Sequence, residues 1–159
     1  MPSRSEDVEH LEEAIRLAEQ NVRAGGGPFG AVVVRDGDVI ARGVNRVTVD
    51  LDPTAHAEVV AIRAACEVLD DFQLHGCTIY ASCEPCPMCL GAIHWARPEA
   101  IVWAAEREDA AEAGFDDSHI YEQIPLPPDR RALTSRQVDH PDARRPFRAW
   151  LAHDARTRY

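Results

Sequence analysis

The sequence contains no lysine, and this absence excludes several classes of enzyme. All 17 residues in its lysine-plus-arginine total are arginines. A Schiff-base mechanism, a lysine-anchored pyridoxal phosphate and a P-loop nucleotide site each require the lysine amine. We therefore expect any catalysis to depend on other groups.

The sequence also lacks an apolar run long enough to cross a bilayer, and its first residues lack the apolar core of a signal peptide. Its composition, 45% apolar and 28% charged, is typical of a globular protein. A length of 159 residues suffices for one domain with a hydrophobic core and is too short for two ordinary ones. We expect a single domain over residues 1–159, located in the cytoplasm and without a membrane partner.

Basic charge is scarce, since the formal net charge is −10. Nucleic-acid binding usually requires a concentrated basic face, so we expect no nucleic-acid partner. The charge is uneven, because residues 129–159 hold eight arginines against four aspartates, a formal charge of about +4, and the remainder carries about −14. A basic tail on an acidic body indicates that the tail docks, either on its own body or on a neighbour's.

The cysteines do not form the even set that is typical of a disulfide framework. There are five, namely Cys66, Cys77, Cys83, Cys86 and Cys89. In an apparently cytoplasmic chain, metal binding or simple burial explains them better. We assign the first three to buried apolar positions.

Helical and strand-like patterns alternate along the chain, which predicts an α/β fold with a layered sheet. Apolar residues at three- and four-residue spacing predict a helix over residues 5–24. An Asp-Gly pair at 36–37 lies between strand-like runs at 31–34 and 39–44 and predicts a tight hairpin. The other expected helices are at 54–69 (capped by Thr54 or Asp52), at 86–96, as short helices within 109–122, and from 147. Further strands are expected at 77–82, 100–104 and, weakly, 132–138.

Two short motifs contain the residues of a catalytic zinc site. One is His56-Ala57-Glu58 and the other is Pro85-Cys86-Pro87-Met88-Cys89, each near the start of an expected helix. Zinc prefers nitrogen and sulfur ligands in a tetrahedron, and a catalytic zinc leaves one position open for water. His56, Cys86 and Cys89 supply three ligands, and the spacing of the cysteines puts both sulfurs on one helix face. We predict one zinc ion per subunit.

Glu58 is the candidate proton carrier of this site. It can take a proton from the attacking water, pass it to a ring nitrogen and later protonate the departing amino group. H-x-E combined with P-C-x-x-C is the pattern of zinc-dependent nucleobase deaminases. A purely structural zinc site leaves Glu58 without a role, and an iron–sulfur run would require a cysteine at Ile93.

A G-x-G-x-x-G pattern at Gly25, Gly27 and Gly30 does not indicate a dinucleotide site. It follows an expected helix and precedes an expected strand, and a dinucleotide-binding loop requires the reverse order. We expect these glycines to end the first helix and to let the backbone pass close to a ligand.

Several stretches resemble the bacterial guanine deaminases of the cytidine deaminase-like superfamily. The two zinc motifs and Trp95-Ala96-Arg97-Pro98 resemble the superfamily broadly. More particular to guanine deaminases are Gly27-Pro28-Phe29-Gly30-Ala31, Ala104-Ala105-Glu106, the stretch from Asp109 to Asp117, and the C-terminal Tyr159. The resemblance covers nearly the whole chain and is densest from Asn45 to Ile124.

The resemblance implies a cytidine deaminase-like three-layer fold, with a mixed five-stranded sheet flanked by helices. It implies hydrolysis of guanine to xanthine and ammonia. It also implies a homodimer in which residues 129–159 are exchanged between subunits, so that each tail lies over the partner's active site. The basic charge of the tail agrees with this arrangement.

The resemblance also assigns substrate contacts. Phe29 is expected to stack on or flank the purine, Asn45 to hydrogen-bond it, and Trp95 to wall the pocket. Ala57 belongs to the substrate-binding residues as well.

Two further assignments concern the closing of the site. Asp117 is expected to bind N–H groups of guanine and to assist proton transfer, as a second catalytic carboxylate. Tyr159 is expected to close the site from the neighbouring subunit. His94 departs from the family pattern, which often has tyrosine there, and leaves the substrate preference open.

Three alternatives remain. The substrate could be another aminated ring, namely ammeline, cytosine or guanosine. The chain could act as a tRNA adenosine deaminase, which shares both zinc motifs but would need a basic face. It could also be a zinc-stabilised interaction module without catalytic activity.

Overall fold

The computed structural model describes residues 4–159, which divide into two compact units. The first unit extends to Asp117, and the second covers Ser118–Tyr159. The elements of the first unit are α1 (Arg4–Arg23), β1 (Gly30–Arg35), β2 (Asp38–Val44), α2 (Val47–Asp50), α3 (Ala57–Leu69), β3 (Cys77–Cys83), α4 (Pro87–Ala96), β4 (Ala100–Ala105) and α5 (Arg107–Glu112).

β1 and β2 form the antiparallel hairpin that the Asp-Gly pair predicts. Asp36 and Gly37 have positive φ values of 53° and 87°. A two-residue turn needs positive φ at both positions in order to match the twist of its strands. This prediction is confirmed.

The sheet is mixed and has the order β2-β1-β3-β4. β1 pairs antiparallel with β3, and β3 pairs parallel with β4. The expectation of five strands is wrong, because the described residues form a sheet of four. The missing element is the weak strand expected at 132–138, which has no regular structure and mostly exposed side chains. A strand needs a neighbour to pair with its backbone N–H and C=O groups, and the described part of the second unit contains no strand that could pair with it.

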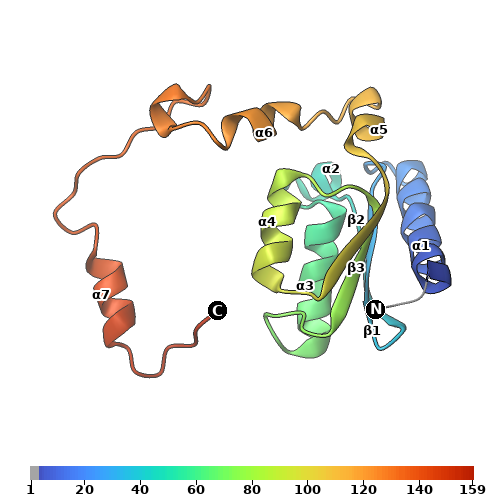
Figure 1. The fold of residues 1–159 in the computed structure, drawn as a ribbon, viewed down its shortest axis with the longest axis horizontal. Coiled ribbons are helices and arrows are strands. Elements are labelled where there is room, and N and C mark those ends of the chain that lie inside the picture. The colour runs from blue at the N-terminus through green and yellow to red at the C-terminus, as the bar shows by residue number, and fades with distance from the viewer. Residues whose placement is uncertain (1–3) are drawn as a thin grey trace. The chain divides into compact units, whose positions relative to one another are not determined.

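Each face of the sheet packs against different helices, as Figure 1 shows. Val32, Val34 and Tyr80 pack with Leu11 and Leu17 of α1 on one face. The alternate side chains of the same strands point the other way. They form a second cluster with α3 and α4, whose buried members are Ala31, Val33, Ala41, Ala57, Ala61, Ala65, Leu74, Cys77, Ile79, Ile93 and Ala96. The first unit therefore has the expected three layers.

Gly43 of β2 brings α3 unusually close to the sheet. A Cβ atom built at this glycine would collide with the backbone carbonyl oxygen of Ala57 and with the backbone nitrogen of Ala61. Only glycine permits this approach. The contact places the first turn of α3, which includes Glu58, against the end of β2.

The second unit consists of short helices and irregular chain. It contains α6 (Ser118–Gln123), a 3₁₀ turn (Pro128–Arg130) and α7 (Arg145–Ala152). Phe147, Trp150 and Leu151 of α7 have exposed side chains, and arginines flank them along the helix. None of the described helices is both long and apolar enough to cross a membrane.

Candidate active site

The first turns of α3 and α4 begin with two of the predicted zinc ligands. His56 is the N-cap residue of α3 and Cys86 is that of α4. The prediction that Thr54 or Asp52 caps α3 is wrong. Asp52 Oδ1 instead accepts hydrogen bonds from the Thr54 nitrogen and hydroxyl, at 2.8 and 2.7 Å, in a turn before the helix. Pro87 follows Cys86 and suits a first helical position because it has no N–H to satisfy.

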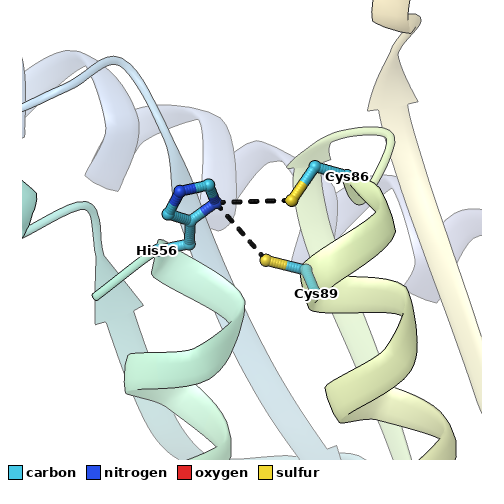
Figure 2. A group of neighbouring side chains, drawn as sticks. All are labelled: His56, Cys86 and Cys89. Atoms are coloured by element: carbon cyan, nitrogen blue, oxygen red, sulfur yellow. Dashed lines mark hydrogen bonds between the residues drawn. The ribbon is translucent and has the colours of Figure 1, made fainter. Parts of the chain in front are cut away.

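The three predicted ligands meet at one point, as Figure 2 shows. His56 Nδ1 lies 3.5 Å from the Sγ atoms of both Cys86 and Cys89, and the three ligand atoms lie within 4.8 Å of one another. Tetrahedral zinc with ordinary bond lengths would hold a nitrogen and a sulfur ligand about 3.6 Å apart. The donor set and its spacing therefore fit a zinc ion with one position left open.

The charges of the three ligands are coupled. A hydrogen bond with Cys89, followed by one with His56, lowers the pKa of Cys86 to about 4 against the effect of burial. The bond to Cys86 and then burial raise the pKa of Cys89, and the bond to Cys86 raises the pKa of His56. Zinc binds cysteine as thiolate and histidine as neutral imidazole, so metal binding releases the protons that these three groups hold.

Cys83 is separate from this group, although it completes a C-x-x-C-x-x-C run. It is buried at the end of β3, where its Sγ lies 3.5 Å from the Glu106 carbonyl oxygen. Burial raises the pKa of Cys83 to about 11, so it stays a thiol. Its assignment as a buried apolar residue is confirmed, and the iron–sulfur alternative has no geometric support.

Glu58 lies in the first turn of α3 beside the ligands. Its side chain is only 8% exposed, and burial raises the pKa of its carboxyl. A hydrogen bond with Cys89 acts in the opposite direction. A buried carboxyl next to a zinc site is suited to hold and deliver a proton.

Phe29 and Asn45 lie side by side at the same end of the sheet. Phe29 precedes β1 and Asn45 follows β2, and the Asn45 nitrogen donates to the Phe29 carbonyl oxygen at 3.1 Å. Asn45 is buried, and its Oδ1 accepts a hydrogen bond from the Val47 nitrogen at 3.2 Å. Ala57 is fully buried at the start of α3. Their contacts with a substrate stay predictions.

Asp117 is half-buried at the end of the first unit. Its Oδ1 lies 3.8 Å from Nε of Arg107. Partial burial raises the pKa of Asp117, Arg107 opposes the shift, and the charge of Cys86 adds to it. The role of Asp117 in substrate binding and proton transfer stays a prediction.

Two neighbours of Asp117 were not among the predicted site residues. Phe115 packs edge-on against Phe29, with ring centroids 5.0 Å apart at 87°, and Arg107 forms the ion pair with Asp117. Phe115 lies within the stretch that resembles guanine deaminases. Arg107 belongs to no motif, so the sequence offered no signal for it.

Trp95 and Tyr159 are the remaining predicted contacts. Trp95 is in the last turn of α4 and is 67% exposed, and His94 beside it is exposed. Tyr159 belongs to the second unit, where its ring lies 6.5 Å from that of Trp150. The roles of Trp95 and Tyr159 stay predictions.

Residues 4–105 match the family described as the cytidine and deoxycytidylate deaminase zinc-binding region. This segment includes all three ligands and Glu58. The chain belongs to this deaminase family. Zinc is therefore the cofactor, and the cluster of His56, Cys86 and Cys89 has the donor atoms that could hold it.

Within the deaminase family, the chain is similar to a guanine deaminase over most of its length. The chain is 59% identical to the guanine deaminase of Bacillus subtilis over 141 residues, which cover 88% of this chain and 90% of that protein. The X-ray structure of the Bacillus subtilis guanine deaminase superimposes with a TM-score of 0.94, at 55% identity, over 95% of this chain and 97% of that one. A tRNA-specific adenosine deaminase of the same organism is 40% identical over 101 residues, covering 64% of this chain and 63% of that protein.

Proposed function

We propose that the protein is a zinc-dependent hydrolase that converts guanine to xanthine and ammonia. The observation that carries the proposal is the 59% identity to a guanine deaminase over 88% of the chain. It is supported by the cluster of zinc-type ligands and by the buried carboxyl beside them.

The chemistry follows from the residues around the ligands. His56, Cys86 and Cys89 would hold zinc, which supplies a Lewis acid that makes water acidic enough to react at neutral pH. Glu58 accepts a proton as the water oxygen bonds to the carbon bearing the amino group, and delivers this proton to the adjacent ring nitrogen. Glu58 then carries the second water proton to the amino group, so that the C–N bond breaks and ammonia leaves.

The substrate contacts complete the proposal. Phe29 flanks the purine ring, and the Asn45 side chain hydrogen-bonds its edge. Asp117 accepts hydrogen bonds from guanine N–H groups and assists proton transfer. Ala57 lies against the base, and Trp95 walls the pocket.

A panel of substrates tests the proposal directly. The zinc-loaded protein is incubated with guanine, guanosine, cytosine, ammeline and a tRNA containing the target adenosine, and ammonia release is measured. We expect release from guanine in equal amount with xanthine, and its loss after chelation. Rapid turnover of another compound with none of guanine would reject the substrate. Tight tRNA binding that weakens steeply with salt would favour the tRNA alternative.

We also propose that the protein is a homodimer that exchanges its C-terminal segments, with Tyr159 closing the partner's site. The segment 129–159 is basic and the rest of the chain is acidic. The exposed apolar side chains of α7 require a partner surface. The first unit offers a mostly apolar pocket of about 420 Å³ between α1 and α5, lined in part by Ile15, Ala18 and Ala110.

A cytoplasmic location is part of the same proposal. None of the five cysteines forms a disulfide, as is usual in a reducing compartment. Three of these thiols lie outside the ligand cluster and have no other assigned chemistry.

A further inference from the structure

We propose that Asn21 of α1 positions Asn45 for substrate binding. The side-chain amide of Asn21 joins the two segments that provide the expected purine contacts, the loop of residues 24–29 and the end of β2. The inference rests on the proposed role of Asn45 and adds a residue that has no contact with the metal ligands among its described interactions.

The two N–H groups of the Asn21 amide have separate acceptors. Nδ2 donates to the Gly27 carbonyl oxygen at 2.8 Å and to the Asn45 carbonyl oxygen at 2.8 Å. These acceptors are 6 and 24 residues away in the sequence. A single primary amide has just the two donors that this bridge requires.

The backbone of Asn21 fixes the same loop. Its carbonyl oxygen accepts hydrogen bonds from the Gly26 nitrogen at 2.9 Å and from the Ala24 nitrogen at 3.1 Å. The Gly27 carbonyl oxygen also accepts from the Phe29 nitrogen at 2.9 Å. The conformation that presents Phe29 therefore depends on the end of α1.

The loop in turn contacts the Asn45 side chain. A Cβ atom built at Gly27 would lie 2.9 Å from Cγ of Asn45, so the glycine backbone and the amide are in close contact. The backbone carbonyl oxygen of Asn45 accepts a hydrogen bond from Asn21, and its backbone nitrogen donates to Phe29. Its side-chain Oδ1 accepts from the backbone nitrogen of Val47. These bonds orient the Asn45 amide, and its Nδ2 is the group that we expect to donate to an acceptor on the base.

Replacing Asn21 by aspartate keeps the shape of the side chain and removes both donors. The matched control is Gln20→Glu, which makes the same amide-to-carboxylate change at the adjacent, exposed position of α1. Both variants place a negative charge near the helix C-terminus, where it is unfavourable. The difference between them reports the lost bridge together with the repulsion between the new carboxylate and the two carbonyl oxygens.

Steady-state kinetics with guanine provide the readout. We expect Asn21→Asp to raise KM about tenfold, which corresponds to about 1.4 kcal/mol, the scale of one orienting hydrogen bond. We expect kcat and zinc content to change much less, because the ligands and Glu58 are on other elements. Asn21→Ala, which has a better helix-forming residue, serves as a second variant if the aspartate prevents folding.

A double-mutant cycle with Asn45→Ala separates this inference from the proposed function. If Asn21 acts through Asn45, Asn21→Asp adds little to KM in the Asn45→Ala background. Additive effects, or an Asn21→Asp variant that behaves like Gln20→Glu, would overturn the inference while leaving the role of Asn45 intact. An unchanged KM in Asn45→Ala alone would refute the role of Asn45, and with it the positioning through Asn45.

Discussion

Glu58 is both buried and adjacent to the metal ligands, and this combination suits a residue that transfers protons. Its carboxyl is almost fully removed from solvent, and burial raises its pKa. It also lies two residues from His56, in the first turn of the helix that His56 caps, so it is beside the metal position. A carboxyl in this setting can hold a proton near the reacting atoms and release it within one catalytic cycle.

Replacing Glu58 by glutamine should abolish most turnover without unfolding the protein. Glutamine has nearly the same shape and cannot carry a proton, so we expect kcat to fall by about 10²–10⁴-fold or more. Zinc content should remain that of the unmodified protein. Glu67→Gln, at an exposed position of the same helix, is the control. Normal activity in Glu58→Gln would remove Glu58 from the mechanism.

The individual residues that the sequence predicted correctly are those that belong to a recognisable motif. Zinc binding needs a fixed set of donors, so His56, Cys86 and Cys89 were recognisable from their motifs, and the structure brings them together. Asn21 was not predicted, because an asparagine near a helix end has no distinctive spacing. Its importance comes from two carbonyl groups that are distant in the sequence.

Among the helices and strands, α3 connects the hydrophobic core to the candidate active site. Its buried face packs in the cluster with Ala61 and Ala65, and its first turn provides His56 and Glu58. The close approach at Gly43 fixes the distance of this turn from the sheet. Substitutions that disturb the packing between α3 and β2 should therefore affect both the free energy of unfolding and the metal site.

Gly43→Ala is expected to lower the free energy of unfolding by about 1–3 kcal/mol, as is typical of overpacking. The new methyl group would collide with the backbone of α3, and backbone atoms cannot move aside as a flexible side chain can. Urea denaturation of the zinc-loaded protein measures the loss. Gly91→Ala is the matched control, because nothing lies within 4 Å of a Cβ atom there, and alanine favours the helix. Equal stabilities would contradict the tight contact.

Among the helices and strands, a turn set by adjacent residues could be predicted from the sequence, but the pairing of strands from distant segments could not. The Asp36-Gly37 turn was predicted correctly because its backbone angles depend on two adjacent residues. The start of α3 was misplaced, because Asp52 hydrogen-bonds to Thr54 instead of capping the helix. The prediction of a strand at 132–138 was wrong, because a strand forms only where a neighbouring strand is available to pair with it.

The whole molecule divides its charge unequally between an acidic body and a basic C-terminal segment. Opposite charges attract over roughly 8 Å at physiological salt, so the segment should favour an acidic surface. The sequence alone left open whether this surface belongs to the same chain or to a second copy. A test must therefore distinguish the two chains of a dimer.

Co-expression of two inactive variants makes this distinction. One chain carries Glu58→Gln with an intact tail, and the other has an intact site but lacks Tyr159. If tails are exchanged, mixed dimers combine the intact site with the partner's intact tail, and about a quarter of all sites regain activity when chains pair at random. If each tail covers its own site, co-expression restores nothing. Two differently tagged unmodified chains provide the control for pairing.

The N-termini of α3 and α4 have a consequence for the folding of this protein. Neither His56 nor Cys86 makes a side-chain capping hydrogen bond within its own helix, so a zinc ion bound by both residues would tether the two helix ends to each other. Its removal by chelation should let the two first turns fray together, because one tether serves both. Hydrogen exchange followed by mass spectrometry should then accelerate at residues 57–60 and 88–90 in parallel, while the middle of α1 keeps its protection. The ion would thus stabilise the N-termini of both helices in addition to taking part in the reaction.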